Sequence, residues 1–418
     1  MQKFDILIVG GGLVGLTTAL AIRQLTQLTV AVVDDKKPTQ LTDKPEARVI
    51  AINAVSKQLF DNLGVWTSEL EQRIQPYQQM HIWDSSGFGS VDFNCQDIST
   101  RSQQKQLGWI IENTVIHNVL WKKAESDPGI KLFCESKLND VAMGDNEVFA
   151  SFVHEKQSYP PIIAKLVIGA DGPNSWLRQQ MNMPIIFRDY DHHAIVATIK
   201  CPQGHQNTAW QVFLETGPLA LLPMALKDEG ADLCSIVWST SPSEASRLCA
   251  LSLSDFGKEL TAASDGKLGN ISVLSERTCL ALTMRFSQNF VKQRTVLVGD
   301  AAHSFHPLAG QGVNLGLLDA ASLAEVIAEA ADIDPTGNNW QSTKTLNNYQ
   351  RWRKSEAAEM VAAMEIIKQL FTPQQGPIKL ARGLGMSLMN SSTRVKKQLI
   401  KQALGLKGQR PKLAKRYP

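Results

Sequence analysis

The sequence predicts an α/β fold in which a nucleotide-binding domain is split by a sheet-rich insertion and followed by a helical region. Three observations predict it: a strand, glycine and helix pattern opens the chain, a similar pattern recurs at residues 295–316, and short alternating strands occupy the stretch between them. We expect a discontinuous domain formed by residues 1–184 and 283–335, an inserted domain over 185–282 and a helical region over 336–418. A chain of 418 residues is long enough for two or three domains.

The start of the chain carries a dinucleotide-binding fingerprint of the Rossmann type. A strand at Asp5–Val9 is followed by glycines in G-x-G-x-x-G spacing, a helix at Leu16–Leu25 and a second strand at Leu28–Val33. One glycine makes the turn, one lets the backbone approach a pyrophosphate, one allows close helix packing, and an acid after the second strand bonds a ribose hydroxyl. A strand–helix–strand unit without a nucleotide is the less favoured alternative. The residues expected in these roles are Gly10, Gly12, Gly15 and Asp34, with Asp35 as the second choice for the acid.

The second pattern presents a carboxylate at the end of a strand and then a glycine-rich loop that leads into a helix. The strand is Thr295–Val298, Asp300 follows the turn at Gly299, and helical spacing begins at Val313. Backbone N–H groups and the positive end of the helix dipole favour an electron-rich ligand in such a loop. An ordinary loop that contains glycines and an aspartate is the alternative.

Other strands and helices fill the first domain, and one more carboxylate, Asp171, follows a strand. Arg48 lies on a loop beside the expected nucleotide site, where it either follows a phosphate or flavin edge or is an unremarkable surface arginine. The expected elements are, in chain order, a strand at Val49–Ile52, a helix at Ala54–Leu63, an antiparallel hairpin over 77–96, a helix from Glu112–Asn113 to Lys123, and a strand at Leu166–Ile168 leading into the turn Gly169–Ser175.

The insertion and the region after it differ in the spacing of their apolar residues: strand-like alternation dominates the insertion, and helical spacing follows it. The insertion is expected to form the far wall of a pocket, with a helix near Ser254–Ala263, and residues 340–370 have the spacing of a long amphipathic helix. Because no glycine-rich fingerprint occurs a second time, we expect one permanent dinucleotide site. The strands predicted in the insertion are Ala194–Ile199, Ala209–Leu214, Ala220–Pro223 and Leu233–Ser239.

Composition narrows the classes of function. The six cysteines are scattered without a C-x-x-C pair, which argues against a disulfide framework or a zinc site and fits a reducing cytosol. The eight histidines show no metal-ligand spacing, so no metal is expected. The apolar run Ile6–Ile22 contains three consecutive glycines and no cleavage site, so it is interpreted as a buried strand and helix, and a cytoplasmic protein is expected.

The end of the chain is strongly basic. Residues 366–418 contain 12 Lys and Arg and no Asp or Glu, whereas the rest of the chain contains 31 basic and 40 acidic residues. Either an amphipathic helix at an anionic membrane surface or a basic helix docked on the protein's own acidic body explains this pattern. Nucleic acid is not expected, because the tail has few aromatic residues for base stacking. The helical spacing is carried by Leu384, Leu388, Ser392, Val395, Leu399 and the pair Ala403/Leu404.

Together these motifs resemble the class A flavoprotein aromatic hydroxylases, which implies a p-hydroxybenzoate hydroxylase-like fold. The three marks are the initial glycines, GADG at Gly169–Gly172 and GDAAH at Gly299–His303. Longer stretches resemble the bacterial ubiquinone-biosynthesis hydroxylases, the UbiH, UbiF and VisC group, over nearly the whole chain: RVIAIN at 48–53, IIENTVIHNVLW at 110–121, ADGPNSWLR at 170–178 and HPLAGQGVNLG at 306–316. Within that group, WDSSGFG at 83–89, His192-His193 and LCSIVWS at 233–239 look most like the 2-polyprenylphenol hydroxylases of the VisC type, which implies hydroxylation at ring position C5.

The resemblance implies FAD as the resident cofactor and assigns its contacts. The initial glycines would hold the pyrophosphate, Asp34 the adenosine ribose, and Asp300 the ribityl chain. Arg48 would lie near the flavin or ADP moiety, and Asp171 where FAD and the reductant approach. Asn113 stands where related enzymes often carry arginine, so its role is less certain. The loop at the pyrimidine edge of the flavin would be Gly310, Gln311, Gly312, Val313 and Asn314.

The resemblance also implies a mechanism. NAD(P)H or another external donor reduces FAD, molecular oxygen adds to give a flavin C4a-hydroperoxide, and its distal oxygen is transferred to the phenol ring. A general base would help because phenolates are hydroxylated faster than phenols. The motif-based candidates are His192, His193, His303 and His306, and a packed or capping role is the alternative for each.

A polyprenylphenol substrate is derived from the membrane, which gives the basic tail a purpose. We expect a cytoplasmic protein that lies peripherally on the inner membrane through residues 366–418. Other ubiquinone-biosynthesis proteins and a second copy of the chain are further partners to be considered. Two other functions share the same FAD architecture: a flavin-dependent reductase of an isoprenoid, and a flavin-containing scaffold subunit of a membrane biosynthetic assembly.

Overall fold

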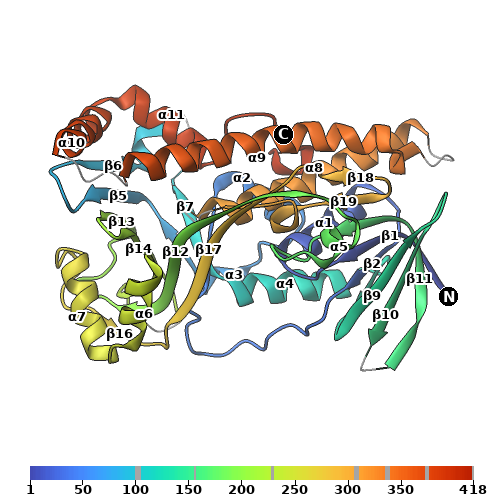
Figure 1. Ribbon diagram of the computed structural model, residues 1–418, viewed down its shortest axis with the longest axis horizontal. Helices are drawn as coiled ribbons and strands as arrows, with labels where there is room; N and C mark the ends of the chain where they lie inside the picture. The colour runs from blue at the N-terminus through green and yellow to red at the C-terminus, as the bar shows by residue number, and fades with distance from the viewer. Residues whose placement is uncertain are drawn as a thin grey trace.

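The computed structural model (Figure 1) has the α/β architecture that the sequence predicts. A sheet with parallel strands at its centre lies at one end and a largely antiparallel sheet at the other, and the long C-terminal helices run across both. The structure describes residues 1–98, 105–154, 157–226, 230–305, 310–334, 339–371 and 376–416.

The first sheet has the start of the chain at its centre. β1 (Gln2–Val9) pairs in parallel with β2 (Val30–Val33) on one side and with β11 (Gln157–Gly169) on the other. Such a strand is covered on both faces and is therefore apolar throughout; Ile6, Leu7 and Ile8 are fully buried. The described strands follow the order β18 (Val291–Lys292), β19 (Thr295–Leu297), β11, β1, β2, β8 (Ile130–Phe133), and β9 (Ser136–Met143) and β10 (Val148–His154) extend the sheet beside β11.

The second sheet is not confined to the predicted insertion. It contains the expected strands, of which β12 (Ile185–Lys200) and β17 (Thr278–Ser287) are long and reach back toward the first sheet (Figure 1). The predicted hairpin, β5 (Gln79–Asp84) and β6 (Ser90–Asn94), joins it because β5 pairs in parallel with β13. The remaining strands are β13 (Thr208–Leu214), β14 (Gly217–Pro223), β15 (Leu233–Thr240), β16 (Ser272–Val273) and β20 (His303–Ser304).

Two helices pack together at the centre of the molecule. α1 (Leu13–Leu25) is the crossover between β1 and β2, and α8 (Gln311–Ile333) lies against it and is buried along most of its length. A small third sheet of β3 (Val49–Ile52), β7 (Gly108–Glu112) and β4 (Ile74–Tyr77) adjoins them. The other helices are α2 (Ala54–Asn62), α3 (Ser68–Glu71), α4 (Asn113–Glu125), α5 (Trp176–Gln180), α6 (Pro242–Ala250), α7 (Leu253–Ala263), α9 (Thr343–Phe371), α10 (Gly376–Ser391) and α11 (Thr393–Ala403).

The basic tail is docked on the rest of the protein. The predicted amphipathic helix is two helices, because the chain breaks at Ser392, a residue type that favours caps over helix interiors. α11 buries Ile400 with Leu404 in a cluster that includes Tyr77. Ion pairs tie the tail to the body: Arg382 with Asp84 at 2.6 Å, Lys379 with Glu215 at 2.8 Å, and Lys396 with Asp97 at 3.2 Å.

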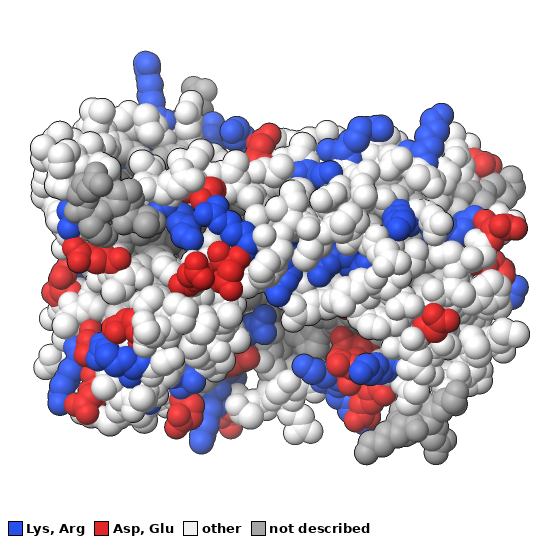
Figure 2. Space-filling view, in the orientation of Figure 1, with Lys and Arg blue, Asp and Glu red and all other residues white. Residues whose placement is uncertain are grey.

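Docking leaves an apolar face of α10 in solvent. Leu380, Leu384 and Leu388 are 55%, 56% and 72% exposed. They are spaced by four residues and lie opposite the buried residues Arg382 and Met386. Figure 2 shows this corner of the molecule as a largely uncharged surface. Among the described residues, none of the helices combines the length and the apolar composition needed to cross a bilayer.

Candidate functional site

The first glycine turn has the geometry of a pyrophosphate site. A Cβ on Gly10, whose φ is +105°, would lie 2.4 Å from the Ala170 carbonyl oxygen, and one on Gly15 would lie 1.9 Å from the Gly10 carbonyl oxygen. Neither position admits a side chain. Gly12 caps α1 without a side-chain hydrogen bond, and a Cβ there would meet nothing within 4 Å. The N–H groups at the start of α1 therefore face open space, as an anion site requires.

Asp34 lies at the end of β2 beside this turn. Its Oδ2 accepts a hydrogen bond from the Gly11 N–H at 2.6 Å, and its Oδ1 accepts from the Lys36 N–H at 2.8 Å. The carboxylate is therefore fixed next to the open end of α1. Asp35 is exposed, so the structure favours Asp34 for a ribose contact, which stays a prediction.

The GADG turn meets the first glycine turn directly. Gly169 pairs with Val9, and the Ala170 N–H donates to the Val9 carbonyl oxygen at 2.8 Å. Asp171 Oδ2 accepts from the Leu177 N–H at 3.1 Å at the start of α5. Burial raises the pKa of Asp171. Asp171 thus supports the first turn of α5, whose N-cap is Ser175, and its contact with FAD or the reductant stays a prediction.

The second glycine segment is brought to the first by the packing of α1 on α8. A Cβ on Gly299 would lie 3.1 Å from Val14, and one on Gly316 would lie 2.9 Å from the same side chain. The short 3₁₀ turn η2 (Gly299–Ala301) places Asp300 on the wall of a cavity. Asp300 is accessible from the cavity but enclosed by protein, so burial raises its pKa, while His303 and Arg48 act to lower it.

At the start of α8, Gly310 and Asn314 pack on β3, whereas there is free space beside Gly312. Gly310 has a φ of +60°, and a Cβ there would lie 3.0 Å from Ala51. Asn314 holds the helix to β3: its side chain accepts from the Asn53 N–H at 3.0 Å and donates to the Ala51 carbonyl oxygen at 2.7 Å. A Cβ on Gly312 would meet nothing within 4 Å.

The cavity of about 270 Å³ lies between these loops and the second sheet. One wall carries the charged residues Arg48 and Asp300 and consists of β3 and the loops predicted to hold the flavin. The facing wall is largely apolar and comes from β13, β14 and β15. The lining residues include Arg48, Ala51, Asp300, Gly310, Gly312 and Val313 on the first wall, and Ala209, Trp210, Gln211, Ala220, Leu222 and Val237 on the second.

Three other residues predicted at the flavin, Arg48, Asn113 and Gln311, have different positions. Arg48 is exposed and lines the cavity. The Asn113 N–H donates to the Arg48 carbonyl oxygen at 3.0 Å at the start of α4, but Asn113 is not among the residues that line the cavity. The Gln311 side chain donates to the Ala403 carbonyl oxygen at 3.3 Å, so α11 is tied to the start of α8.

The described candidate bases do not line the cavity. His303 is buried, and its Nε2 lies 2.6 Å from Asp319. His192 and His193 lie on β12, where Nδ1 of His193 is 3.7 Å from the Cys279 sulfur; burial and Lys368 lower the pKa of His192. His306 lies outside the described residues.

Tyr77 does line the cavity, but burial raises its pKa to about 12, so it is a neutral phenol.

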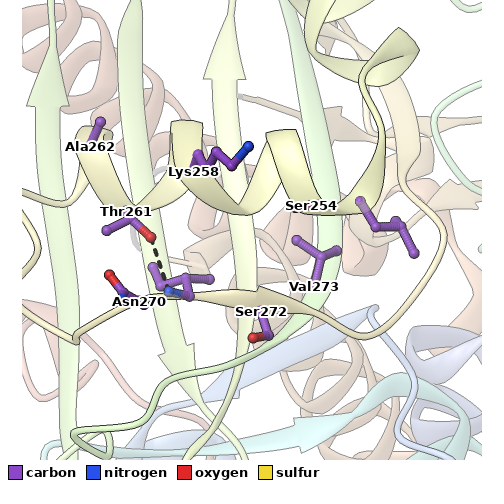
Figure 3. A pocket seen from close by; sticks show the side chains of 9 residues that line it. Ser254, Lys258, Thr261, Ala262, Asn270, Ser272 and Val273 are labelled. Atoms are coloured by element: carbon purple, nitrogen blue, oxygen red, sulfur yellow. Dashed lines mark hydrogen bonds between the residues drawn. The ribbon is translucent and has the colours of Figure 1, made fainter.

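Other surface features do not suggest chemistry. A second hollow of about 650 Å³ lies between α7 and β16 (Figure 3). Its lining side chains are apolar or neutral polar, such as Thr261 and Asn270, apart from Lys258, which pairs with Asp255 at 2.8 Å. In the part of the chain that the structure describes, no group of three His, Cys, Asp or Glu side chains is arranged to hold a metal.

Sequence reasoning missed a buried polar cluster behind the cavity. Asp319 lies within α8 and is fully buried, as is Arg353 on α9, and Nε of Arg353 donates to the Asp319 carboxylate at 2.7 Å. The signal in the sequence is one acid, Asp319, within the run Leu315–Ala321, whose other residues are leucine, alanine and glycine. A charge in such a position is almost always paired.

Comparison with known proteins gives consistent matches over nearly the whole chain. Residues 3–364 match the family described as FAD binding domain. The chain is 32% identical to the 3-demethoxyubiquinol 3-hydroxylase of Escherichia coli, over 97% of this chain and 99% of the relative. It is 31% identical to the ubiquinone biosynthesis monooxygenase COQ6 of Xenopus tropicalis, over 95% and 92%, and 30% identical to the ubiquinone hydroxylase UbiL of Rhodospirillum rubrum, over 96% and 89%.

Solved structures share the fold at low sequence identity. The p-nitrophenol 4-monooxygenase PnpA of Pseudomonas putida has a TM-score of 0.78 at 17% identity and covers 97% of this chain and 99% of its own. The Diels-Alderase PyrE3 has a TM-score of 0.72 at 19% identity, over 98% and 82%. Because these two names describe different reactions, the likeness shows the fold alone.

Proposed function

The chain belongs to the family of FAD-dependent aromatic monooxygenases that includes the ubiquinone-biosynthesis hydroxylases, and from this premise we propose that it hydroxylates the ring of a polyprenylphenol intermediate of ubiquinone biosynthesis at position C5. FAD, a nicotinamide reductant and molecular oxygen are the cofactor and cosubstrates of this class. The observation that carries the proposal is the cavity, which has the flavin loops on one wall and an apolar sheet on the other.

The residues fit FAD. Gly12 and Gly312 leave space at the N-termini of two helices, and two strand ends present Asp34 and Asp300. In the proposed arrangement α1 holds the pyrophosphate, Asp34 the adenosine ribose, Asp300 the ribityl chain, and the start of α8 the pyrimidine edge of the flavin. When bound, FAD supplies the redox and oxygen chemistry that side chains lack.

The protein's contribution is placement and exclusion of water. The wall formed by Trp210, Leu222 and Val237 offers an apolar surface for a ring substrate. Such a lining excludes water and so limits side reactions in the site. Arg48, Tyr77 and Asp300 are the titratable side chains among the lining residues that the structure describes.

Mass spectrometry of the quinone precursor that accumulates in a deletion strain tests the ring position. We expect a prenylated phenol without the C5 hydroxyl. Accumulation of 3-demethoxyubiquinol would instead give the chain the substrate named for the E. coli relative. Substrate-triggered oxygen consumption by the purified protein separates a hydroxylase from an isoprenoid reductase, and an unchanged product level with Asp300→Ala would favour a scaffold role.

The exposed leucine face of α10 supports a further part of the proposal, docking on an anionic lipid surface. Three leucines face solvent together, and the neighbouring α11 carries exposed Arg394 and Lys401. An apolar face with cations beside it suits a bilayer that contains anionic lipid.

Flotation with vesicles of anionic and of neutral lipid tests this docking. Leu384→Glu/Leu388→Glu should abolish binding to anionic vesicles, while Ile333→Glu, at an 81% exposed position at the end of α8, should leave it unchanged. Truncation after Phe371 is a poorer test because it removes Ile400 and Leu404, which pack beside Tyr77. A change in oligomeric state with unchanged lipid binding would indicate a second copy of the chain as the occupant.

A further inference from the structure

A buried cluster lies directly behind the turn that carries Asp300. Asp319 and Arg353 are 0% exposed and His303 is 1% exposed. One oxygen of Asp319 accepts from the Gly299 N–H at 3.0 Å and lies 2.6 Å from His303 Nε2, and the other accepts from Arg353 Nε at 2.7 Å. A single carboxylate thus joins α8, α9 and the η2 turn.

The cluster fixes the backbone on both sides of Asp300. Gly299 has a φ of +58°, and its N–H, the group bonded by Asp319, immediately precedes Asp300. His303 follows three residues later and is held by the same carboxylate. Before the turn, the Tyr349 hydroxyl donates to the Leu297 carbonyl oxygen at 2.8 Å.

Charge keeps Asp319 in its acceptor form. Burial acts to raise the pKa of Asp319, but His303 and Arg353 outweigh it and hold the pKa below its ordinary value. The guanidinium of Arg353 also pairs with Glu356 at 2.6 Å. Since an ionised carboxylate only accepts hydrogen bonds, His303 must donate from Nε2, so this nitrogen is not free to take a proton. The Nδ1 atom is buried and has no hydrogen-bond partner among the described residues.

We propose that Asp319, His303 and Arg353 are positioning residues for FAD, which hold the Gly299–Asp300 turn in the conformation that presents Asp300 to the cofactor, and that His303 is not a base. None of the three residues is among those that line the cavity, so the inference rests on FAD binding and is independent of which ring carbon is hydroxylated. Outer partners of this kind pre-organise the groups that contact a ligand.

Asp319→Asn tests the proposal when it is compared with Asp84→Asn. Asp84 is equally buried and pairs with Arg382 at 2.6 Å, but it lies on β5 and does not line the cavity. We expect Asp319→Asn to weaken FAD binding by roughly tenfold to a hundredfold, by analogy with the loss of an outer partner at metal sites. Asp84→Asn should reduce resistance to urea and leave the Kd for FAD unchanged. FAD fluorescence quenching on titration with apo-protein measures the Kd, and urea unfolding of the apo-protein measures stability.

A pair of variants at His303 separates positioning from packing and from base catalysis. His303→Gln keeps a donor toward Asp319 and should retain the Kd for FAD and the pH profile of the rate, whereas His303→Phe should weaken FAD binding. If Asp319→Asn does not fold, this pair decides the question. Equal FAD affinity of His303→Gln and His303→Phe, or equal effects of Asp319→Asn and Asp84→Asn on the Kd, would overturn the proposal. A lost pH dependence with His303→Gln would make His303 a base.

Discussion

The close approach of α1 and α8 can be tested with one methyl group. Gly316→Ala places a Cβ 2.9 Å from Val14 Cγ2 and 3.1 Å from the Gly299 Cα. Carbon atoms prefer about 3.5–4.0 Å, and valine is stiff at χ1 within a helix, so α8 must shift. Overpacking of this kind costs about 1–3 kcal/mol, while replacing a helix glycine by alanine gains about 1 kcal/mol. The free energy of unfolding should therefore fall by about 0–2 kcal/mol.

Gly385→Ala is the matched control. This glycine lies in the exposed part of α10, and a Cβ there would meet nothing within 4 Å. Gly385→Ala should raise the free energy of unfolding by about 1 kcal/mol from helix propensity alone. Urea unfolding of the apo-protein, followed by tryptophan fluorescence, measures both variants, and FAD titration reports the displacement of the Gly299 turn.

Val14→Ala should rescue Gly316→Ala because it removes the methyl group that the new Cβ meets. Residues in contact typically show coupling of about 0.5–3 kcal/mol. If Gly316→Ala stabilises the protein as much as Gly385→Ala, or if Val14→Ala gives no rescue, the two helices do not approach closely enough to join the two glycine segments at one ligand.

Three further predictions follow from the charged groups. Asp300→Asn should weaken FAD binding in a titration but should raise the stability of the apo-protein at pH 7, because burial disfavours ionised Asp300. The gain in stability over the wild type should vanish below about pH 4, where Asp300 is neutral in the unfolded wild type as well. The depressed pKa of Asp319 contributes stability that is present above the unfolded value of about 3.9 and is lost as pH falls through the lower folded value, so the urea midpoint of the wild type should fall more steeply in acid than that of Asp319→Asn. Arg73→Met leaves Glu112, 2% exposed and bonded at 2.6 Å, without its partner, and should cost about 3–5 kcal/mol in urea unfolding, whereas Lys258→Met at the exposed pair with Asp255 should leave unfolding unchanged.

The elements with local signals could be predicted from the sequence. The strand, glycines and helix at the start are set by steric rules within 30 residues, and the 77–96 hairpin by alternation and a glycine turn. Its sheet membership could not be predicted, because β5 pairs with β13 more than 100 residues later. The helical spacing of Leu384 and Leu388 was detected, but whether that face is buried or exposed depends on which side of α10 docks.

The loops of the candidate site could be predicted from the sequence, but the buried residues that hold these loops in place could not. Asp300 stands at a strand end beside glycines, a pattern that is visible in one stretch of chain. The role of Asp319 depends on Arg353, which is 34 residues away on a different helix. His303 belongs to a motif that suggested a base, and only the three-dimensional contact with Asp319 shows that its ring is turned away from the cavity.

The pKa values of Asp300 and Asp319 shift in opposite directions, and the two aspartates have different roles in the site. Burial raises the pKa of Asp300, so the charge it presents to the cavity opposes folding of the apo-protein. Asp319 has its pKa lowered by partners that satisfy it fully, so its charge favours folding. A ligand-binding group whose charge opposes folding needs other contacts that hold its conformation. Asp319 provides such a contact because its oxygen accepts a hydrogen bond from the Gly299 N–H, which precedes Asp300. Asp319 therefore stabilises the same turn that the charge of Asp300, facing the cavity, destabilises.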